Sequence, residues 1–182
     1  MLKIQENRKK SPNFNKNILK NTHFFVTLRK TKEKGDYMIR KIKEEDLTKV
    51  MTIWVKGNFK ANSFIEKDYW LEIYNQVKVD FLENFKTYVY IENEEILGFI
   101  SIDENEIKAI FVKEENRGHE IGTKLLNYYR NNLEENAELF VKVFEKNMNG
   151  IIFFSNLQFK NTKIQLNEQF NETEYVMTWK KE

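Results

Sequence analysis

The stretch Ile110-Phe-Val-Lys-Glu-Glu-Asn-Arg117-Gly-His-Glu-Ile-Gly122-Thr-Lys-Leu-Leu126 decides how this chain is organised. An apolar run ends at Val112, a polar loop follows, and the spacing of the apolar residues predicts a helix that starts near Ile121. The first backbone N–H groups of a helix have no partner inside the helix, and about half a positive charge is found there. A strand, a glycine-bearing loop and a helix N-terminus in succession therefore predict a phosphate or pyrophosphate site, and so a nucleotide-like cofactor.

The composition predicts a globular protein of one domain. The 182 residues are 32% charged and 41% hydrophobic, which suits a domain with an ample core. Cysteine is absent, which excludes disulfides, thiolate metal sites and cysteine nucleophiles, and with only two histidines we expect no metal site. No apolar run reaches the roughly 20 residues that a membrane helix needs. The N-terminal residues lack the apolar run of a secretory signal, so we expect a cytoplasmic protein without a membrane partner.

The charge is distributed unevenly along the chain. Residues 1–37 hold ten Lys and Arg and three acidic residues, whereas residues 38–182 hold 20 basic and 25 acidic residues. A basic arm can bind nucleic acid or anionic lipid, but such a segment is more often a solvated tail. We expect residues 1–37 to be a basic extension that is disordered or not part of the natural protein. Residues 38–182 are expected to form the domain, and nucleic acid is not expected as a partner.

Periodicity and turn signals predict the remaining elements. We expect helices at 44–57, ending at Gly57-Asn58, at 66–85, from 121 to about 133, and at 149–156. We expect strands at 38–42, 87–91, 96–102, 106–112, 139–144, 158–166 and 174–180. This order predicts a single α/β domain with a mixed sheet.

Several motifs together resemble one family. Arg117-Gly118-His119-Glu120-Ile121-Gly122 is similar to Gln/Arg-x-x-Gly-x-Gly/Ala, the central motif of the GCN5-related N-acetyltransferases (GNAT superfamily). Leu97-Gly98-Phe99-Ile100 resembles the third strand of the family, and Glu145-Lys146-Asn147 with Phe153-Phe154 resembles the segment around its fourth helix. Phe64-Ile65 with Tyr69-Trp70 resembles a bacterial subgroup of single-domain enzymes that includes protein-lysine acetyltransferases. The resemblance covers residues 38–182.

The resemblance implies a single-domain GNAT fold, with a mixed, mostly antiparallel sheet of about six to seven strands flanked by about four helices. It also implies an acetyl-CoA-dependent N-acetyltransferase that needs no metal. The acceptor would be a primary amine of a small molecule, of a protein lysine or of a protein N-terminus, attacking directly in a ternary complex. Such a protein is expected to be a monomer or a homodimer.

The resemblance also assigns residues to the cofactor. The loop amides would hold the pyrophosphate, and the edge of the fourth strand would pair with the pantetheine arm as an added strand does. The residues implied are Ile110, Phe111, Val112, Arg117, Gly118, His119, Glu120, Ile121, Gly122, Thr123 and Asn147. His119 could touch the 3′-phosphate side of the cofactor or could simply be exposed.

Three residues depart from the family's pattern. Glu120 replaces the first glycine of the loop, Phe154 replaces the tyrosine that commonly protonates the departing thiolate, and Gln158 replaces a glycine before Phe159. A carboxylate about 5 Å from a phosphate would repel it by roughly 3 kcal/mol at an effective dielectric near 20. General acid catalysis is a term of about 10²–10⁴-fold. The alternative function is therefore a catalytically weakened or inactive acyl-CoA-binding regulatory protein on the same fold.

Four further residues are candidates for the reaction and the acceptor. Glu106, at the start of a strand, could be the base that deprotonates the amine, or a solvated carboxylate. Tyr90 could supply a hydroxyl to the site, and Phe64 and Trp70 could line the acceptor cleft. Aromatic residues at these spacings are also typical of a core.

Overall fold

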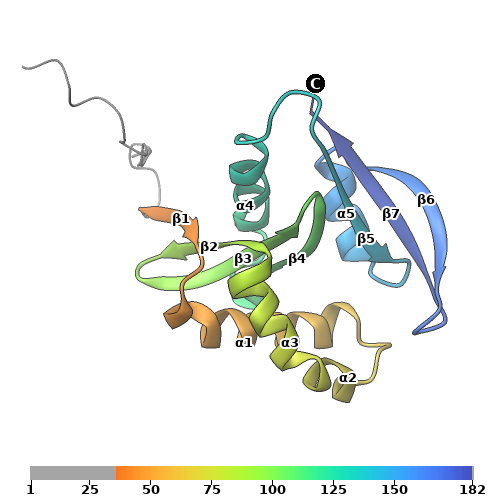
Figure 1. The fold of residues 1–182 in the computed structure, drawn as a ribbon, viewed down its shortest axis with the longest axis horizontal. Coiled ribbons are helices and arrows are strands. Elements are labelled where there is room, and N and C mark those ends of the chain that lie inside the picture. The colour runs from red at the N-terminus through yellow and green to blue at the C-terminus, as the bar shows by residue number, and fades with distance from the viewer. Residues whose placement is uncertain (1–35, 182) are drawn as a thin grey trace, which may run out of the picture. The chain divides into compact units, whose positions relative to one another are not determined.

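The structure, a computed structural model, describes residues 36–181 (Figure 1). One sheet has the strand order β1-β2-β3-β4-β5-β7-β6, in which only β4 and β5 are parallel neighbours. The strands are β1 (Tyr37–Lys41), β2 (Lys86–Glu92), β3 (Glu95–Asp103), β4 (Glu106–Val112), β5 (Glu138–Phe144), β6 (Lys160–Asn167) and β7 (Glu172–Lys180). The α-helices are α1 (Leu47–Ala61), α2 (Lys67–Glu72), α3 (Tyr74–Val79), α4 (Ile121–Arg130) and α5 (Met148–Asn156). The predicted mixed α/β architecture is confirmed.

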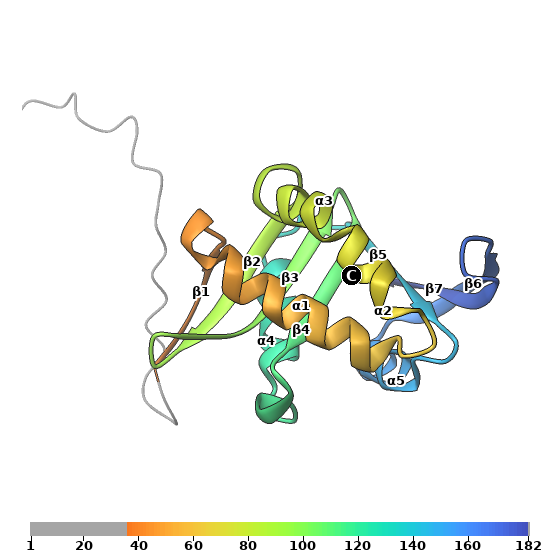
Figure 2. The same ribbon diagram turned by 90° about the horizontal axis from the view of Figure 1, so that it is seen from below.

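A separate core lies on each face of the sheet, because successive strand residues point to opposite faces. Val89 and Phe99 lie in the core that α1 covers, whereas Ile100 and Ile102 lie in the core that α4 covers. α1 contacts β3 and β4, and α4 contacts β2, β3 and β4 (Figure 2). The loop between β4 and α4 therefore carries the chain from the sheet to the face opposite α1.

β4 and β5 are paired only where they begin. Their one register pair is Glu106 with Phe140, and the amide of Phe140 donates to the carbonyl of Asn105 at 2.9 Å. Beyond this point the edge of β4 that faces β5 has no strand partner among residues 36–181. Unpaired backbone groups along an edge are a template for an added extended chain.

Three predicted helices differ from the structure, and one of them, expected to reach about residue 133, ends at Arg130. α1 does not end at Gly57-Asn58 but continues to Ala61. A Cβ on Gly57 would lie 2.3 Å from the ring of Phe111, so this glycine permits close packing of α1 on β4 and does not end the helix. The predicted helix 66–85 is two helices, α2 and α3, followed by a π-helical turn, because Ile73 (φ −82°, ψ −4°) interrupts it. Five α-helices are therefore described instead of about four.

The prediction for the N-terminal extension falls mostly outside the described residues. β1 begins at Tyr37, one residue before the predicted boundary, and the ring of Tyr37 stacks on Tyr90 with centroids 4.9 Å apart. None of the helices within residues 36–181 is long and apolar enough to span a membrane.

Candidate active site

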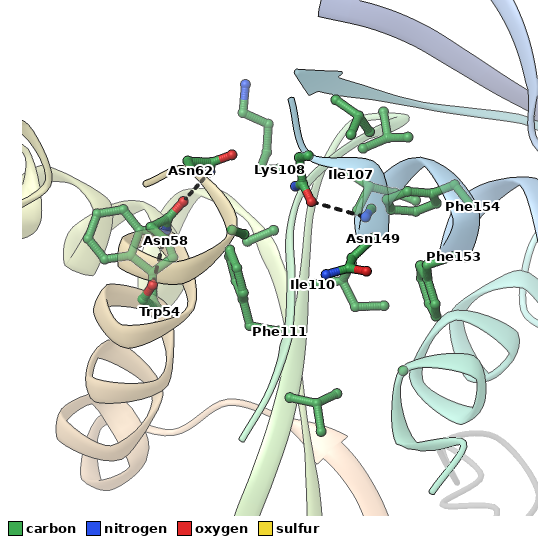
Figure 3. Close-up of a pocket in the computed structure, with 18 of the residues that line it drawn as sticks. Trp54, Asn58, Asn62, Ile107, Lys108, Ile110, Phe111, Asn149, Phe153 and Phe154 are labelled. Atoms are coloured by element: carbon green, nitrogen blue, oxygen red, sulfur yellow. Dashed lines mark hydrogen bonds between the residues drawn. The ribbon is translucent and has the colours of Figure 1, made fainter. Parts of the chain in front are cut away.

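A cavity of about 1070 Å³ lies where β4 and β5 diverge. Figure 3 shows β4 in its middle, with Phe111 on the side of α1 and Ile110 on the side of α5. The cavity therefore opens to both faces of the sheet, and its volume suits a large cofactor. Most of the predicted site residues line it: Trp70, Glu106, Ile110, Phe111, Val112, Arg117, Gly118, Glu120, Ile121, Gly122, Thr123, Asn147 and Phe154.

The N-terminus of α4 faces this cavity with free backbone donors. The first hydrogen bond of the helix runs from the Lys124 amide to the Glu120 carbonyl at 2.8 Å. The amides of residues 121–123 precede it, and within residues 36–181 no side chain caps this end. Uncapped amides and the positive end of the helix dipole form an anion site.

Gly122 allows α4 to approach α5. A Cβ at this position would lie 3.1 Å from the ring of Phe153 and 3.8 Å from the side chain of Val112. A larger residue would need the ring of Phe153 to shift by a few tenths of an ångström, so the second glycine of the predicted motif permits tight packing beside the free amides.

The two positions where the chain departs from a family glycine both keep a left-handed backbone. Glu120 has φ +61° and Gln158 has φ +67°. A non-glycine residue in this region costs on the order of 1–3 kcal/mol. The loop therefore has the shape that glycine favours, while Glu120 adds an exposed carboxylate among the residues that line the cavity.

Two basic side chains lie near this loop. Arg117 Nε lies 3.4 Å from the carbonyl oxygen of Val112, at the end of the free β4 edge. Lys60, in the last turn of α1, donates to the carboxylate of Glu114. This hydrogen bond and the charge of Lys60 lower the pKa of Glu114. The contact between Lys60 and Glu114 connects α1 with the turn that precedes the loop.

The N-terminus of α5, in contrast, is capped by its own side chain. Asn147 Oδ1 accepts a hydrogen bond from the Gly150 amide at 3.0 Å. Asn147 lines the cavity, and its remaining Nδ2 group is the part of the side chain that a ligand could use. The Nδ2 group of Asn147 has no partner within residues 36–181, so donation is the contact that the cap leaves free for a ligand.

Phe154 lies in the last part of α5 and is 4% exposed. Its ring centroid is 5.1 Å from those of both Phe153 and Phe159. It lines the cavity but carries no proton, so it cannot act as a general acid.

Glu106 stands at the point where β4 and β5 separate. Its side chain is 18% exposed, and its two carboxylate oxygens are each 3.3 Å from an ammonium group, that of Lys108 and that of Lys142. Lys142 belongs to β5, so its ion pair with Glu106 joins the two strands where they separate. An incoming amine would have to compete with these two lysines or reach Glu106 through a water molecule.

Three predicted site residues are not brought into the cavity. His119 is exposed in the loop, and Phe64 packs edge-on against Phe144 with centroids 5.3 Å apart. Tyr90 is 1% exposed in the core on the α4 face, and burial, with smaller effects of Glu92 and Tyr37, raises its pKa to about 12. Phe64 and Tyr90 therefore pack against neighbouring aromatic or core residues and are not among the residues that line the cavity.

Two buried asparagines in the cavity wall were not predicted. Asn58 Nδ2 donates to the Trp54 carbonyl at 3.0 Å, and Asn62 Nδ2 donates to Asn58 Oδ1 at 2.9 Å (Figure 3). With Val50 and Trp54 they continue one stripe at four-residue spacing, which is the sequence signal that could have identified them. It was missed because Gly57-Asn58 was interpreted as a helix end.

The known proteins to which this chain is similar are acetyltransferases. A model of the acetyltransferase (GNAT) domain matches residues 83–161, which include β4, the loop and α4. The chain is 25% identical over 143 residues to the peptidyl-lysine N-acetyltransferase YiaC of Escherichia coli K12, a match that covers 78% of this chain and 96% of YiaC.

Solved structures share the fold. The solution structure of apo-form YjaB from Escherichia coli has a TM-score of 0.67 and 19% identity, and the match covers 79% of this chain and 97% of that one. The PaiA N-acetyltransferase from Thermoplasma acidophilum, crystallised with coenzyme A, has a TM-score of 0.60 and 20% identity over 80% of this chain and 99% of that one. At these identities the likeness establishes the fold alone.

Proposed function

Since this chain belongs to the GNAT superfamily of acetyltransferases, we propose that it transfers the acetyl group of acetyl-CoA to a primary amine. One observation carries the proposal: the free amides of residues 121–123 and the unpaired edge of β4 line the same cavity. The first can hold a pyrophosphate, and the second can pair with the amides of a pantetheine arm. The structure with coenzyme A among the similar folds is consistent with this ligand.

The cavity offers a path for both substrates. A pyrophosphate at the N-terminus of α4 and an arm along residues 110–112 would direct the thioester towards Glu106, where β4 and β5 separate. The amine would enter from the side of α1 and α2, which supply Asn62 and Trp70 to the wall. Holding both reactants in one site converts a bimolecular reaction into an effectively unimolecular one.

The chemistry needs no nucleophilic side chain. The neutral amine nitrogen attacks the thioester carbonyl, the C–N bond forms, and the C–S bond then breaks to release the thiolate. Glu106 takes the amine proton, directly or through water, while Lys108 and Lys142 hold its carboxylate in place. Because Phe154 has no proton to give, the departing thiolate takes its proton from solvent.

A second candidate, an acyl-CoA-binding regulatory protein, is favoured by two observations. Glu120 places a negative charge beside the predicted pyrophosphate site, and Phe154 removes the acid. The first would weaken binding, and the second would slow turnover. Both functions share the binding site but differ in turnover.

Two measurements test the proposal. Acetyl-CoA at millimolar concentration should raise the melting temperature, because a ligand that binds only the folded state stabilises it. Acetyl-CoA with a panel of primary amines should then release free thiol. No thermal shift would contradict both candidates, and a thermal shift without amine-dependent thiol release would favour the regulatory protein.

A further inference from the structure

Two buried polar atoms in the cavity wall have no hydrogen-bond partner within residues 36–181. They are Asn62 Oδ1, in the residue that ends α1, and Trp70 Nε1, in α2. Both residues are 8% exposed and both line the cavity. Buried polar groups are almost always paired, because an unpaired one loses its hydrogen bonds to water without compensation. Such atoms in a cavity wall therefore point to a ligand that supplies the partners.

The hydrogen-bond ladder along α1 fixes which atom of Asn62 is presented. The Trp54 carbonyl can only accept, so the Asn58 side chain turns Nδ2 towards it. Asn58 Oδ1 then accepts from Asn62 Nδ2, which leaves Asn62 Oδ1 unpaired. Figure 3 shows this oxygen pointing away from Asn58, into the space between α1 and β4. The cavity wall therefore holds a buried hydrogen-bond acceptor at Asn62 that is unpaired within residues 36–181.

The indole of Trp70 presents the opposite group. Its Nε1–H can only donate. The ring is held by edge contacts with Trp54, at a centroid distance of 5.8 Å, and with Tyr69, at 5.1 Å. Because the ring is packed on these neighbours, the direction of its N–H group is fixed before a ligand binds.

Both residues line the cavity on the α1 side of the sheet, away from the N-terminus of α4 (Figure 3). Asn62 directly follows α1 and Trp70 belongs to α2, whereas the free amides of residues 121–123 belong to α4, which covers the opposite face of the sheet. The two unpaired atoms therefore lie in the wall on the side from which the amine is proposed to enter.

We propose that Asn62 and Trp70 select an acceptor that carries an amide group near its amine, as a peptide does, over a simple alkylamine. An N–H group of the substrate donates to Asn62 Oδ1, and a carbonyl of the substrate accepts from Trp70 Nε1. An alkylamine offers donors but no carbonyl, so it leaves the indole N–H unpaired. This inference rests on the proposed acetyltransferase function and names the class of its acceptor.

The test compares matched substrates with the full-length protein. One pair is Nα-acetyl-lysine methylamide and pentylamine, and the other is alanine methylamide and isopropylamine, each rate being corrected for the fraction of free amine. In at least one pair kcat/KM should be at least about tenfold higher for the amide, because a site built to pair polar groups rejects an analogue that lacks them. Equal kcat/KM within both pairs would overturn the inference.

Variants connect the preference to the two residues. Asn62→Leu and Trp70→Phe should each reduce the amide-to-alkylamine ratio about tenfold, mainly by raising KM for the amide, while the thermal shift caused by acetyl-CoA stays as in the wild type. Asn62→Leu removes one unpaired atom and leaves Asn58 Oδ1 unpaired instead, so its melting temperature should change little. Asn127→Leu, an exposed position on α4, is the matched control and should keep the ratio.

The outcomes separate this inference from the proposed function. If no amine is acetylated, the proposed function fails. If amines are acetylated and both variants keep the wild-type ratio, the assignment of Asn62 and Trp70 fails while the acetyltransferase function stands.

Discussion

The N-termini of α4 and α5 line the same cavity but differ in how their backbone amides are satisfied. At α5 the side chain of Asn147 accepts from the Gly150 amide, so the helix supplies its own cap. At α4 no side chain within residues 36–181 does so, and Glu120 precedes the helix in a left-handed backbone conformation. The comparison indicates that the protein itself pairs an amide at the N-terminus of α5, whereas the amides at the N-terminus of α4 have no partner in the described part of the chain and can bind a ligand.

The strongest test of this difference between the two N-termini is to add one carboxylate to the first turn of each helix. Thr123→Asp places the charge beside the free amides of α4, and Asn149→Asp places it in the first turn of α5. A carboxylate there stabilises either helix slightly, so both variants should fold. We expect Thr123→Asp to weaken acetyl-CoA binding about a hundredfold, from repulsion of roughly 3 kcal/mol, and Asn149→Asp to change it less than about threefold.

Isothermal titration calorimetry measures both affinities. Equal losses in the two variants would show that the helix ends do not differ in the way proposed here. Because phosphate repulsion is screened by ions, the loss in Thr123→Asp should also shrink when salt is raised.

A smaller effect is expected from Glu120. Glu120→Gln removes the charge and keeps the side chain in the left-handed backbone, whereas Glu120→Gly removes both. We expect Glu120→Gln to tighten acetyl-CoA binding at least about tenfold, since it removes a repulsion of up to roughly 3 kcal/mol. Glu120→Gly should bind at least as tightly, because glycine adopts this backbone without strain. Unchanged affinity in both variants would mean that the carboxylate points away from the ligand.

Phe154, near the C-terminal end of α5, offers a test of turnover instead of binding. Phe154→Tyr restores a proton donor at a position that lines the cavity. If loss of the thiolate limits the rate, kcat should rise about tenfold, at the low end of general acid catalysis, with acetyl-CoA affinity unchanged. A kcat equal to that of the wild type would contradict the assignment of this position.

The smallest effect concerns stability. Asn147→Ala removes the α5 cap and should lower the free energy of unfolding by about 1 kcal/mol, which corresponds to a fall in melting temperature of about 2–4 °C. Glu120→Ala removes no cap from α4 and keeps a non-glycine residue at the same φ, so its melting temperature should match the wild type. Calorimetry on both variants checks this, and a larger loss from Glu120→Ala would reverse the comparison.

The predicted residues that line the cavity beside α4 are local in the chain. Arg117 to Gly122 and the helix that follows depend on glycine, apolar spacing and turn residues within about ten positions, which sequence patterns report directly. The succession of helices and strands along the chain, and from it the mixed sheet, followed from the same local signals. The cofactor side of the cavity was therefore largely predictable.

The acceptor side was less predictable because distant contacts determine it. Gly57 serves as a close contact with Phe111 and not as a helix end, and only the packing of α1 on β4 distinguishes these uses of glycine. The ion pair between Glu106 and Lys142 depends on the register of a single parallel strand pair. The unpaired atom of Asn62 follows from a ladder that exists only once α1 reaches Ala61.

The most direct measurement of the difference between α4 and α5 is a titration of ¹⁵N-labelled protein with acetyl-CoA, followed by the amide resonances in NMR spectra. If the pyrophosphate binds at α4, the amides of residues 118–123 should show the largest shifts, while those of residues 148–150 at the capped end of α5 shift little. Shifts concentrated at residues 148–150, or none at residues 118–123 under saturating acetyl-CoA, would contradict the assignment of the α4 N-terminus as the cofactor site.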